Sequence, residues 1–189
     1  MTKFLNFLVL LLITSACGSG PGPNAVKNNL AVSHRFIDAF YSFQRDSLQP
    51  LLADAPASQP EILYYQQWAK CANYQVLDRS HINAQNDSVV LCPVTVKDDL
   101  MGSLGIKLNV TDTFHVTLRQ GKIVSVKTSS NDVPEYYRAK EWVKKNRPSY
   151  IDRACEGIWA GGPTPCDCVL GMIKGFREFR GDSIRTGDQ

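Results

Sequence analysis

Apolar residues recur at helical spacing in two stretches of the first half of the chain. Between residues 24 and 52, apolar positions follow one another at steps of three and four, with polar side chains opposite. A second such stretch begins at Pro60 and continues to Ala72. A proline is tolerated in the first turn of a helix, because the N–H group that it lacks would have no partner there. Asp46 and Ser47 can cap a short continuation over residues 48–53, and residues 56–60 form a loop. The pattern therefore predicts a helix, a short helix, a loop and a second long helix. The apolar positions of the first are Leu30, Phe36, Ile37, Phe40, Tyr41 and Phe43.

After Ala72 the apolar period changes to two, which is typical of strands with one buried face. Turn residues separate the alternating runs, with Asn86-Asp87 before the second run and Gln120-Gly121 before the last. The pattern predicts a meander of four antiparallel strands, in which Pro93 favours an edge position or a bulge. The predicted strands cover residues 74–84, 89–96, 104–118 and 122–128.

Helical spacing returns in the last third of the chain. Asp132 and Glu135 have the spacing of a capping box, so a helix is predicted from there to Asn146. A shorter helix over residues 149–155 should follow, and the last helix should begin at residues 164–167 and end near Phe179. Two helices, a meander and further helices make an α+β chain.

The first residues of the chain have the pattern of an export signal. Lys3 precedes an apolar run over residues 4–13, which is too short to cross a bilayer, and small residues lead to Cys17. Residues 13–17 resemble a bacterial lipobox, although Thr14 stands where leucine is usual. Cys17 is therefore expected to become the lipid-modified first residue of the mature chain. The alternative is an ordinary signal peptide, with Cys17 left as a thiol or a disulfide partner.

This pattern predicts an exported protein of the bacterial cell envelope, anchored in the membrane by lipid and facing the periplasm from the outer membrane in a Gram-negative cell. An apolar content of 43% suffices for a core. The formal charge of +3 is nearly balanced and no stretch is densely basic, so nucleic acid is not an expected partner. We expect a signal peptide over residues 1–16, the lipid-bearing cysteine and a flexible tether over 17–24, an α+β domain over 25–131, a helical extension over 132–180 and a frayed tail over 181–189.

Five cysteines remain if Cys17 carries lipid, and outside the cytosol cysteines are expected to oxidise. An odd number predicts two bridges and one leftover thiol. The spacing does not fix the connectivity; the expected pairs are Cys71 with Cys92, and Cys155 with either Cys166 or Cys168. Three of these cysteines follow no standard zinc spacing and have no histidine nearby, so neither a metal nor a cofactor is expected.

Two stretches resemble a known family. Residues 36–53 lead from an aromatic helix through a polar break to Leu-Leu-Ala, and residues 111–126 form an Asp-x-Phe strand, a Gly-Lys turn and an Ile/Val strand. They resemble the first helix and closing hairpin of the nuclear transport factor 2-like superfamily, which includes ketosteroid isomerase, scytalone dehydratase and the SnoaL-type polyketide cyclases. The resemblance covers residues 24–130. It implies a cone-shaped fold, with N-terminal helices packed on a curved antiparallel sheet, to which the C-terminal helices are an addition.

Asp112 is the main candidate for chemistry. In an alternating strand it shares a face with Val110, Phe114 and Val116, so its carboxyl should point inward, where lost hydration raises its pKa. The resemblance to ketosteroid isomerase implies a carboxyl that donates a hydrogen bond to an oxyanion. The alternative is a hydrated Asp112 near the mouth of the cone, or one paired with an arginine.

The rest of that catalytic set does not carry over. Phe36 stands at the place of the isomerase tyrosine and has no hydroxyl to donate. For the general base, only Asp54 is near, and it lies in a proline-interrupted loop. Isomerase chemistry is therefore not favoured.

Ligand-pocket candidates come from the aromatic residues of the two helices and from the strands. Asp78 could line the same cavity as Asp112, although the alternative is that it faces water; for the aromatic residues the alternative is core packing. The candidates are Tyr41, Tyr65, Trp68, Asp78 and Phe114.

We expect the domain to hold a small, mostly apolar ligand, or to dock a second copy or another envelope protein through the outer face of the sheet. The alternative is a cyclase, dehydratase or isomerase with Asp112 as acid or base. A third hypothesis is that the helices after Asp132 close the mouth of the cone as a lid.

Overall fold

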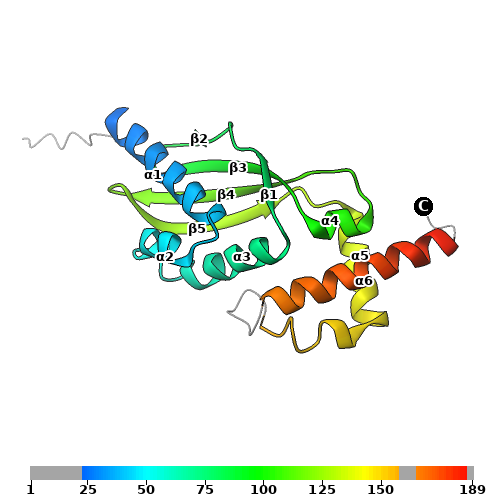
Figure 1. Ribbon diagram of the computed structural model, residues 1–189. Coiled ribbons are helices and arrows are strands. Elements are labelled where there is room, and N and C mark those ends of the chain that lie inside the picture. The colour runs from blue at the N-terminus through cyan, green and yellow to red at the C-terminus, as the bar shows by residue number, and fades with distance from the viewer. Residues whose placement is uncertain (1–22, 158–164, 187–189) are drawn as a thin grey trace, which may run out of the picture.

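The computed structural model describes residues 23–157 and 165–186. Within these ranges the chain folds as α+β, with the N-terminal helices packed on an antiparallel sheet and the C-terminal helices at one end of it (Figure 1). The predicted leader and Cys17 lie outside the described residues. None of the helices in the two ranges combines the length and the apolar character needed to cross a membrane.

The N-terminal helical stretch is divided in the structure. α1 spans Pro23–Tyr41, and the chain then turns at Phe43, whose φ is 56°. A residue in the left-handed region cannot continue a right-handed helix, so the first helix ends here. The separate short helical segment predicted after it is confirmed, although it begins earlier, at Arg45. The remainder forms α2 (Arg45–Leu48) and the 3₁₀ helix η1 (Gln49–Leu52), and α3 (Gln59–Cys71) lies where the second helix was predicted.

The sheet confirms the antiparallel order of the predicted meander, but the predicted strand over residues 74–84 is interrupted, since only residues 75–78 and 83–84 are in strands. Its strand order is β1-β3-β4-β5, and β2 also pairs with β3. Pro93 lies between the parts of β3 that pair with β2 and with β1, so its missing N–H breaks no ladder bond on that side. The strands are β1 (Gln75–Asp78), β2 (Asn83–Ala84), β3 (Val89–Lys97), β4 (Val110–Arg119) and β5 (Lys122–Ser130).

The beginning of the predicted strand over residues 104–118 is wrong. A short helix, α4 (Asp99–Leu104), stands before β4, and β4 begins only at Val110. The side chain of Asp98 caps α4 by accepting hydrogen bonds from two backbone N–H groups, and Gly105 ends it with a φ of 73°. These local caps stabilise a helical turn that the alternating pattern alone did not indicate.

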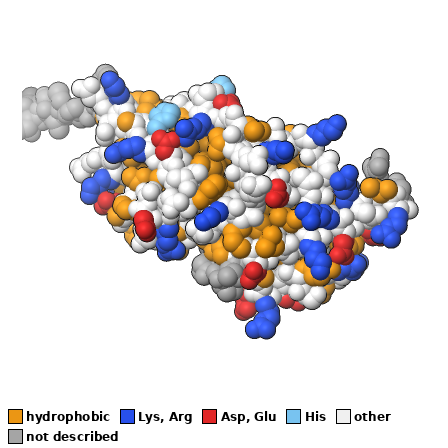
Figure 2. Space-filling view, in the orientation of Figure 1, with side chains coloured by type: hydrophobic (Ala, Val, Ile, Leu, Met, Phe, Trp, Pro, Cys, Tyr) orange, Lys and Arg blue, Asp and Glu red, His pale blue; other side chains and the backbone are white. Residues whose placement is uncertain are grey.

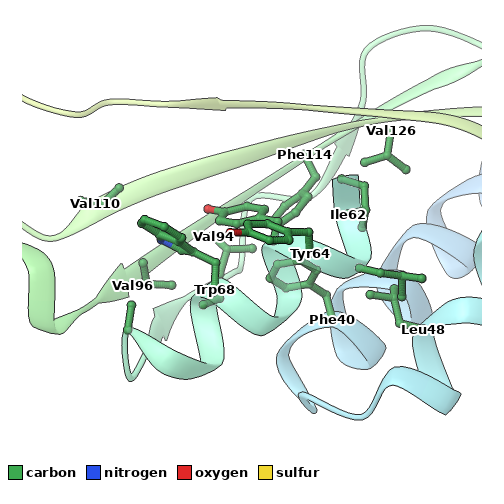
Figure 3. Close-up of a cluster of buried hydrophobic side chains, with 14 of the residues drawn as sticks. Phe40, Leu48, Ile62, Tyr64, Trp68, Val94, Val96, Val110, Phe114 and Val126 are labelled. Carbon is green, nitrogen blue, oxygen red and sulfur yellow. The ribbon is translucent and has the colours of Figure 1, made fainter. Parts of the chain in front are cut away.

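One face of the sheet is buried beneath the N-terminal helices. In β4 every second side chain from Val110 to Leu118 is buried, and the intervening ones are partly exposed. Phe114 is the centre of this core, since its ring contacts those of Phe36 and Phe40 from α1 and of Tyr65 from α3. Figure 3 shows side chains of α3 directed toward the strand that carries Phe114. The other face of the sheet is mixed: its threonines and serines alternate with basic side chains such as Lys127 and with apolar ones such as Leu91.

Two long helices form the C-terminal extension. α5 spans Pro134–Asn146, the 3₁₀ helix η2 spans Pro148–Tyr150, and α6 (Pro165–Thr186) packs on α3, α4 and α5. α5 and α6 approach so closely that a Cβ atom on Gly175 would lie 2.3 Å from a methyl group of Val143. Three predictions are corrected here: residues 149–155 contain only the short η2, residues 181–186 belong to α6 rather than to a frayed tail, and the Asp132 side chain does not cap α5.

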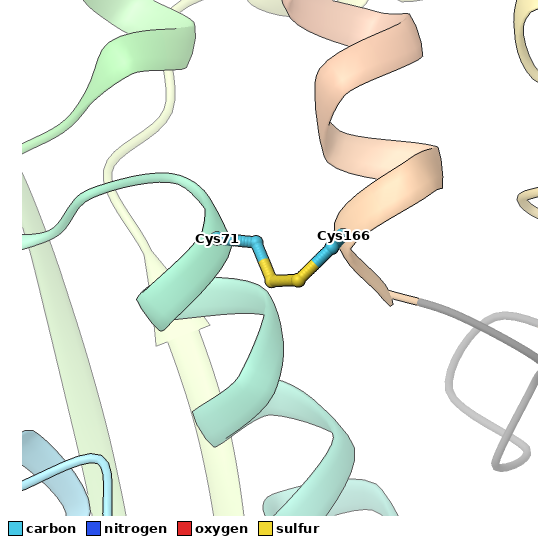
Figure 4. The surroundings of a disulfide bond; sticks show 2 residues. All are labelled: Cys71 and Cys166. Atoms are coloured by element: carbon cyan, nitrogen blue, oxygen red, sulfur yellow. A yellow bond between two sulfur atoms is a disulfide. The ribbon is translucent and has the colours of Figure 1, made fainter.

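Two disulfides tie the extension together and to the domain. Cys155 bonds to Cys168, which confirms one of the two predicted alternatives. Cys71 bonds to Cys166 and thereby joins the end of α3 to the start of α6 (Figure 4). The predicted Cys71–Cys92 pair is wrong, because Cys92 points from β3 into the core and remains a buried thiol. Its burial raises the pKa of this thiol to about 12, which makes it inert as a nucleophile.

Peptide mapping without reductant should recover the Cys71–Cys166 and Cys155–Cys168 links, and Cys92 should be alkylated only after unfolding. The double variants C71S/C166S and C155S/C168S should lower the free energy of unfolding by about 5 and about 3 kcal/mol, because the bridged cysteines are 95 and 13 residues apart and the longer loop restricts the unfolded chain more. Urea denaturation measures both values. Recovery of a Cys71–Cys92 peptide would contradict the structure.

Candidate functional site

A cavity of about 140 Å³ opens at one end of the sheet. Its walls come from α3, from the loop after it, from the start of β4 and the end of β5, and from the segments that hold α4 and α5. An antiparallel meander explains this convergence: β3 and β5 end at the sheet edge where β4 begins, as the pairs Val96–Val110 and Asp112–Ser130 show. The lining residues are Tyr65, Trp68, Tyr74, Asp98, Leu100, Met101, Val110, Asp112, Thr128, Ser130, Asp132, Tyr136 and Lys140.

Asp112 lies in the wall of this cavity, on the buried face of β4. It stands between Val94 of β3 and Ser130 of β5, and only 4% of its surface is exposed. Its Oδ2 atom has no hydrogen-bond partner among the described residues. Burying a carboxylate oxygen without a hydrogen-bond donor costs free energy. The Oδ2 atom is therefore available to accept a hydrogen bond from a ligand in the cavity.

The surroundings of Asp112 favour its neutral form. Burial raises the pKa of its carboxyl to about 6, and the nearby negative charges of Asp132 and Asp98 add to the rise. Hydrogen bonding to Tyr65 and Ser130 opposes the rise by stabilising the charged form. The balance places the titration of Asp112 close to neutral pH, where a modest change of environment changes its charge.

The other two acids of the cavity have different settings. Asp98 uses its Oδ1 atom to accept from the N–H groups of Leu100 and Met101, at 2.8 and 3.0 Å, and its pKa is nevertheless raised by burial. Asp132 is half-buried and accepts a long hydrogen bond from the hydroxyl of Tyr137, at 3.4 Å. In the described ranges, no group of three or more His, Cys, Asp or Glu side chains could hold a metal ion, so these carboxyls are dispersed around the cavity.

Four aromatic side chains form much of the remaining wall. Burial is the largest cause that raises the pKa of Tyr65, Tyr74 and Tyr136, and the charge of Asp112 contributes to each rise. All three hydroxyls therefore stay protonated at neutral pH. Trp68 comes from the same face of α3 as Tyr65 and is 4% exposed.

Lys140 is the only positively charged side chain that lines the cavity within the described part of the chain. It stands on α5, one helical turn after Tyr136, which places both side chains on the same side of that helix. It forms no ion pair with any residue that the structure describes. Three carboxyls therefore face a single lysine.

The structure brings three of the predicted site residues together: Asp112, Tyr65 and Trp68. Tyr41 and Phe114 belong to the aromatic core behind the cavity, with ring centres 6.3 Å apart. The Asp78 prediction is wrong, since β1 is exposed along its whole length and Asp78 accepts a hydrogen bond from the neighbouring Ser80 N–H. A short edge strand without a covering helix leaves its carboxyl in water.

The residues at the places of the isomerase tyrosine and general base do not complete an acid–base set with Asp112. Phe36 is fully buried in the core, and Asp54 pairs with Lys122 at 3.3 Å, at the opposite end of β5. Comparison of the chain with protein-family models, with curated proteins and with solved structures found no match. The chemistry of the site is therefore argued from its own geometry.

Sequence reasoning missed Asp98, Asp132, Tyr74, Tyr136 and Lys140. A signal for the two acids was present: each follows a strand that ends at the edge where β4 begins. Tyr136 and Lys140 could not be found in this way, because the sequence does not tell where α5 folds back.

Replacing Asp112 by Asn should change how stability depends on pH. The folded-state pKa of about 6 exceeds the ordinary value of 3.8, so between these values the folded protein binds a proton that the unfolded chain has released. Relative to D112N, the free energy of unfolding of the unaltered protein should fall by about 3 kcal/mol as pH rises from 3.5 to 7.

Urea titrations of both proteins across this range measure the difference, in which the other titrating groups largely cancel. Parallel curves for the two proteins would show that the carboxyl is not desolvated.

Proposed function

We propose that this chain is an exported, lipid-anchored protein of the bacterial envelope, and that its domain binds a small molecule in the cavity beside Asp112. The observation that carries the proposal is the unpartnered Oδ2 of a 4% exposed carboxyl in a cavity wall. A purely structural carboxyl at this depth would have its acceptors satisfied by the protein, as those of a helix cap are. A ligand that donates to Oδ2 would remove the cost of burying it.

The finer fold proposal is a nuclear transport factor 2-like cone. It is supported by the two N-terminal helices over one face of an antiparallel meander, and by Asp112 on the inward face of the long strand. α4 and the C-terminal extension are departures from the simple pattern. α5 contributes Tyr136 and Lys140 to the cavity, which supports the hypothesis that the extension acts as its lid.

Export is supported by the leader pattern and by the two disulfides, since such bonds persist mainly in oxidising compartments. The lipid on Cys17 would hold the domain at the membrane, facing the periplasm in a Gram-negative cell. Basic side chains on the face shown in Figure 2 are scattered and interleaved with acidic ones. The outer face of the sheet, with Thr95 bonded to Thr111 at 2.9 Å, is where we place a second copy or an envelope partner.

Binding is favoured over catalysis because Asp112 has no established partner for proton transfer: the nearby Asp98 already caps α4 with its Oδ1 atom. The alternative, a cyclase, dehydratase or isomerase, has one observation in its favour: the pKa of Asp112 is raised to about 6, and Tyr65 is hydrogen-bonded to its carboxyl. This alternative needs a second group that exchanges a proton with the ligand. The polar lining also favours a ligand that carries charge over the mostly apolar one expected from the sequence.

The variant C17S should move the protein from the membrane to the soluble fraction, because the lipid supplies the only anchor that the leader pattern provides. Fractionation of the producing cells, with mass spectrometry of the N-terminus, measures this outcome. A C17S protein that stays in the membrane pellet, or a mature chain that begins elsewhere, would contradict the lipid anchor.

Native mass spectrometry of the protein purified from its own envelope should reveal a bound small molecule. The variant T128W should lose it, because Thr128 lines the cavity and a tryptophan there would fill the space. K127W is the matched control, since neighbouring side chains of β5 point to opposite faces of the sheet.

If T128W and K127W carried the small molecule to the same extent, the ligand would lie outside this cavity and the proposed function would be contradicted. Chemical conversion of the recovered molecule by the purified protein, lost in D112N, would favour the enzyme instead.

A further inference from the structure

The cavity combines two wall types that recognise positive charge. Three carboxyls, those of Asp98, Asp112 and Asp132, face a single lysine. Four aromatic residues line the same cavity: Tyr65, Trp68, Tyr74 and Tyr136. Aromatic faces carry negative potential and attract cations, most strongly where water is displaced.

We propose that the ligand is a small organic cation, an alkylammonium, whose charged nitrogen lies among the aromatic rings and beside Oδ2 of Asp112. This inference rests on the function proposed above and assigns a chemical class to the ligand of that cavity. The second observation behind it, besides the acids, is the unpartnered Oδ2 itself, which is buried and lacks a donor within the described chain.

The charge balance excludes the other ligand classes. An anion would add negative charge to a wall that already holds three acids, and it would leave Oδ2 without a partner. A neutral apolar ligand would displace water from the carboxyls without supplying a hydrogen-bond donor or a positive charge to replace it. An ammonium group offers hydrogen-bond donors or a diffuse positive charge to the carboxyls, and it places its carbon substituents against the rings.

A bare metal ion fits less well than an organic cation. Metal ions need several oxygen ligands converging within about 2.6 Å, and no described group of three His, Cys, Asp or Glu side chains offers that. Asp98 is already committed to the N-terminus of α4 through its Oδ1 atom. Carboxyls dispersed around a wider space suit a cation whose charge is surrounded by carbon.

The size of the cavity limits the ligand. A volume of about 140 Å³ holds about five waters, and a cavity of similar volume accepts benzene, so a ligand of roughly six to eight non-hydrogen atoms fills it. A choline-sized ammonium compound fits this space. The same ammonium group linked to a lipid through glycerol and phosphate would have to leave its lipid part outside.

Lys140 gives the site a built-in competitor. Its ammonium lines the cavity on α5 and forms no ion pair with the described residues, so it contributes positive charge where the ligand would bring its own. Removing this charge should strengthen binding of a cation and weaken binding of an anion. The direction of that single change therefore distinguishes the two ligand classes.

The test uses the mature lipoprotein in non-ionic detergent and isothermal titration calorimetry. The probes are choline, n-butylammonium and the uncharged choline isostere 3,3-dimethylbutan-1-ol. Both cations should bind about tenfold or more tightly than the neutral isostere, because only they interact electrostatically with the acids and rings. Glycerophosphocholine is a further probe. If it does not bind, the ligand is a free ammonium compound; if it binds as tightly as choline, the ligand is a lipid headgroup.

Variants locate the binding. D112N should weaken binding of choline about tenfold, and K140Q should strengthen it roughly threefold. Y136L should weaken it about fivefold by removing a ring, whereas Y136F keeps the ring and should bind as the unaltered protein does. K144Q is the control for a charge change on α5 outside the cavity, because Lys144 is exposed and pairs with Glu141 at 2.7 Å.

Two results overturn the proposal without requiring any variant to fold. Equal binding of the neutral isostere and the cations would show that charge is not recognised, and preferential binding of an anion such as butyrate would reverse the sign. Either result leaves a ligand-binding cavity in place. If no probe binds and the envelope-purified protein carries no molecule sensitive to T128W, both the cation proposal and the proposed function fail.

Discussion

The pairing of β3, β4 and β5, whose register is continuous from Asp112 to Thr117, is the constraint on which this structure depends. Its register places Asp112 between Val94 and Ser130, and the two-residue period of β4 then directs the carboxyl to the buried face. A slip of one residue would expose Phe114 and bury threonines, so the register is held by the whole aromatic core. The carboxyl of Asp112 is thus held inside because its neighbours on the same face of β4, such as Phe114, are buried. The polar groups beside it include those that line the cavity and those on the adjacent strands.

Much of this arrangement could be predicted from the sequence where the pattern is long and periodic. The meander, the inward direction of Asp112, and the positions of Tyr65 and Trp68 on one helix all follow from periods of two and 3.6. The failures came where a single residue decides. The side chain of Asp98 caps α4 at its start, and the left-handed Gly105 ends α4 where a strand was predicted to begin. Periodicity cannot reveal such local decisions.

The disulfides illustrate a different limit. Counting cysteines was enough to predict two bridges and one thiol, whereas Cys71 was paired with the wrong partner because Cys92 is near in sequence. In space, Cys92 points from β3 into the core, while Cys71 ends α3 at the surface where α6 begins. The same long-range packing places Tyr136 and Lys140 over the cavity, with Tyr136 held against Phe176 of α6 at a ring distance of 5.6 Å. The disulfide joins α3 to α6, and α6 packs on α5. It therefore restrains α5 relative to α3, and these two helices both contribute side chains to the cavity.

Asp98 and Asp112 show why residue type alone does not define a site. Both carboxyls line the same cavity and both have their pKa raised by burial. Asp98 lies before a helix, so two N–H groups occupy its Oδ1 atom, and its role in the fold is satisfied without any ligand. Asp112 lies within a strand whose N–H groups are committed to the ladder, so the backbone has no donor to spare for Oδ2. A strand can carry an acid into the interior but cannot satisfy it, and that unmet acceptor is what makes Asp112 the residue most available to a ligand.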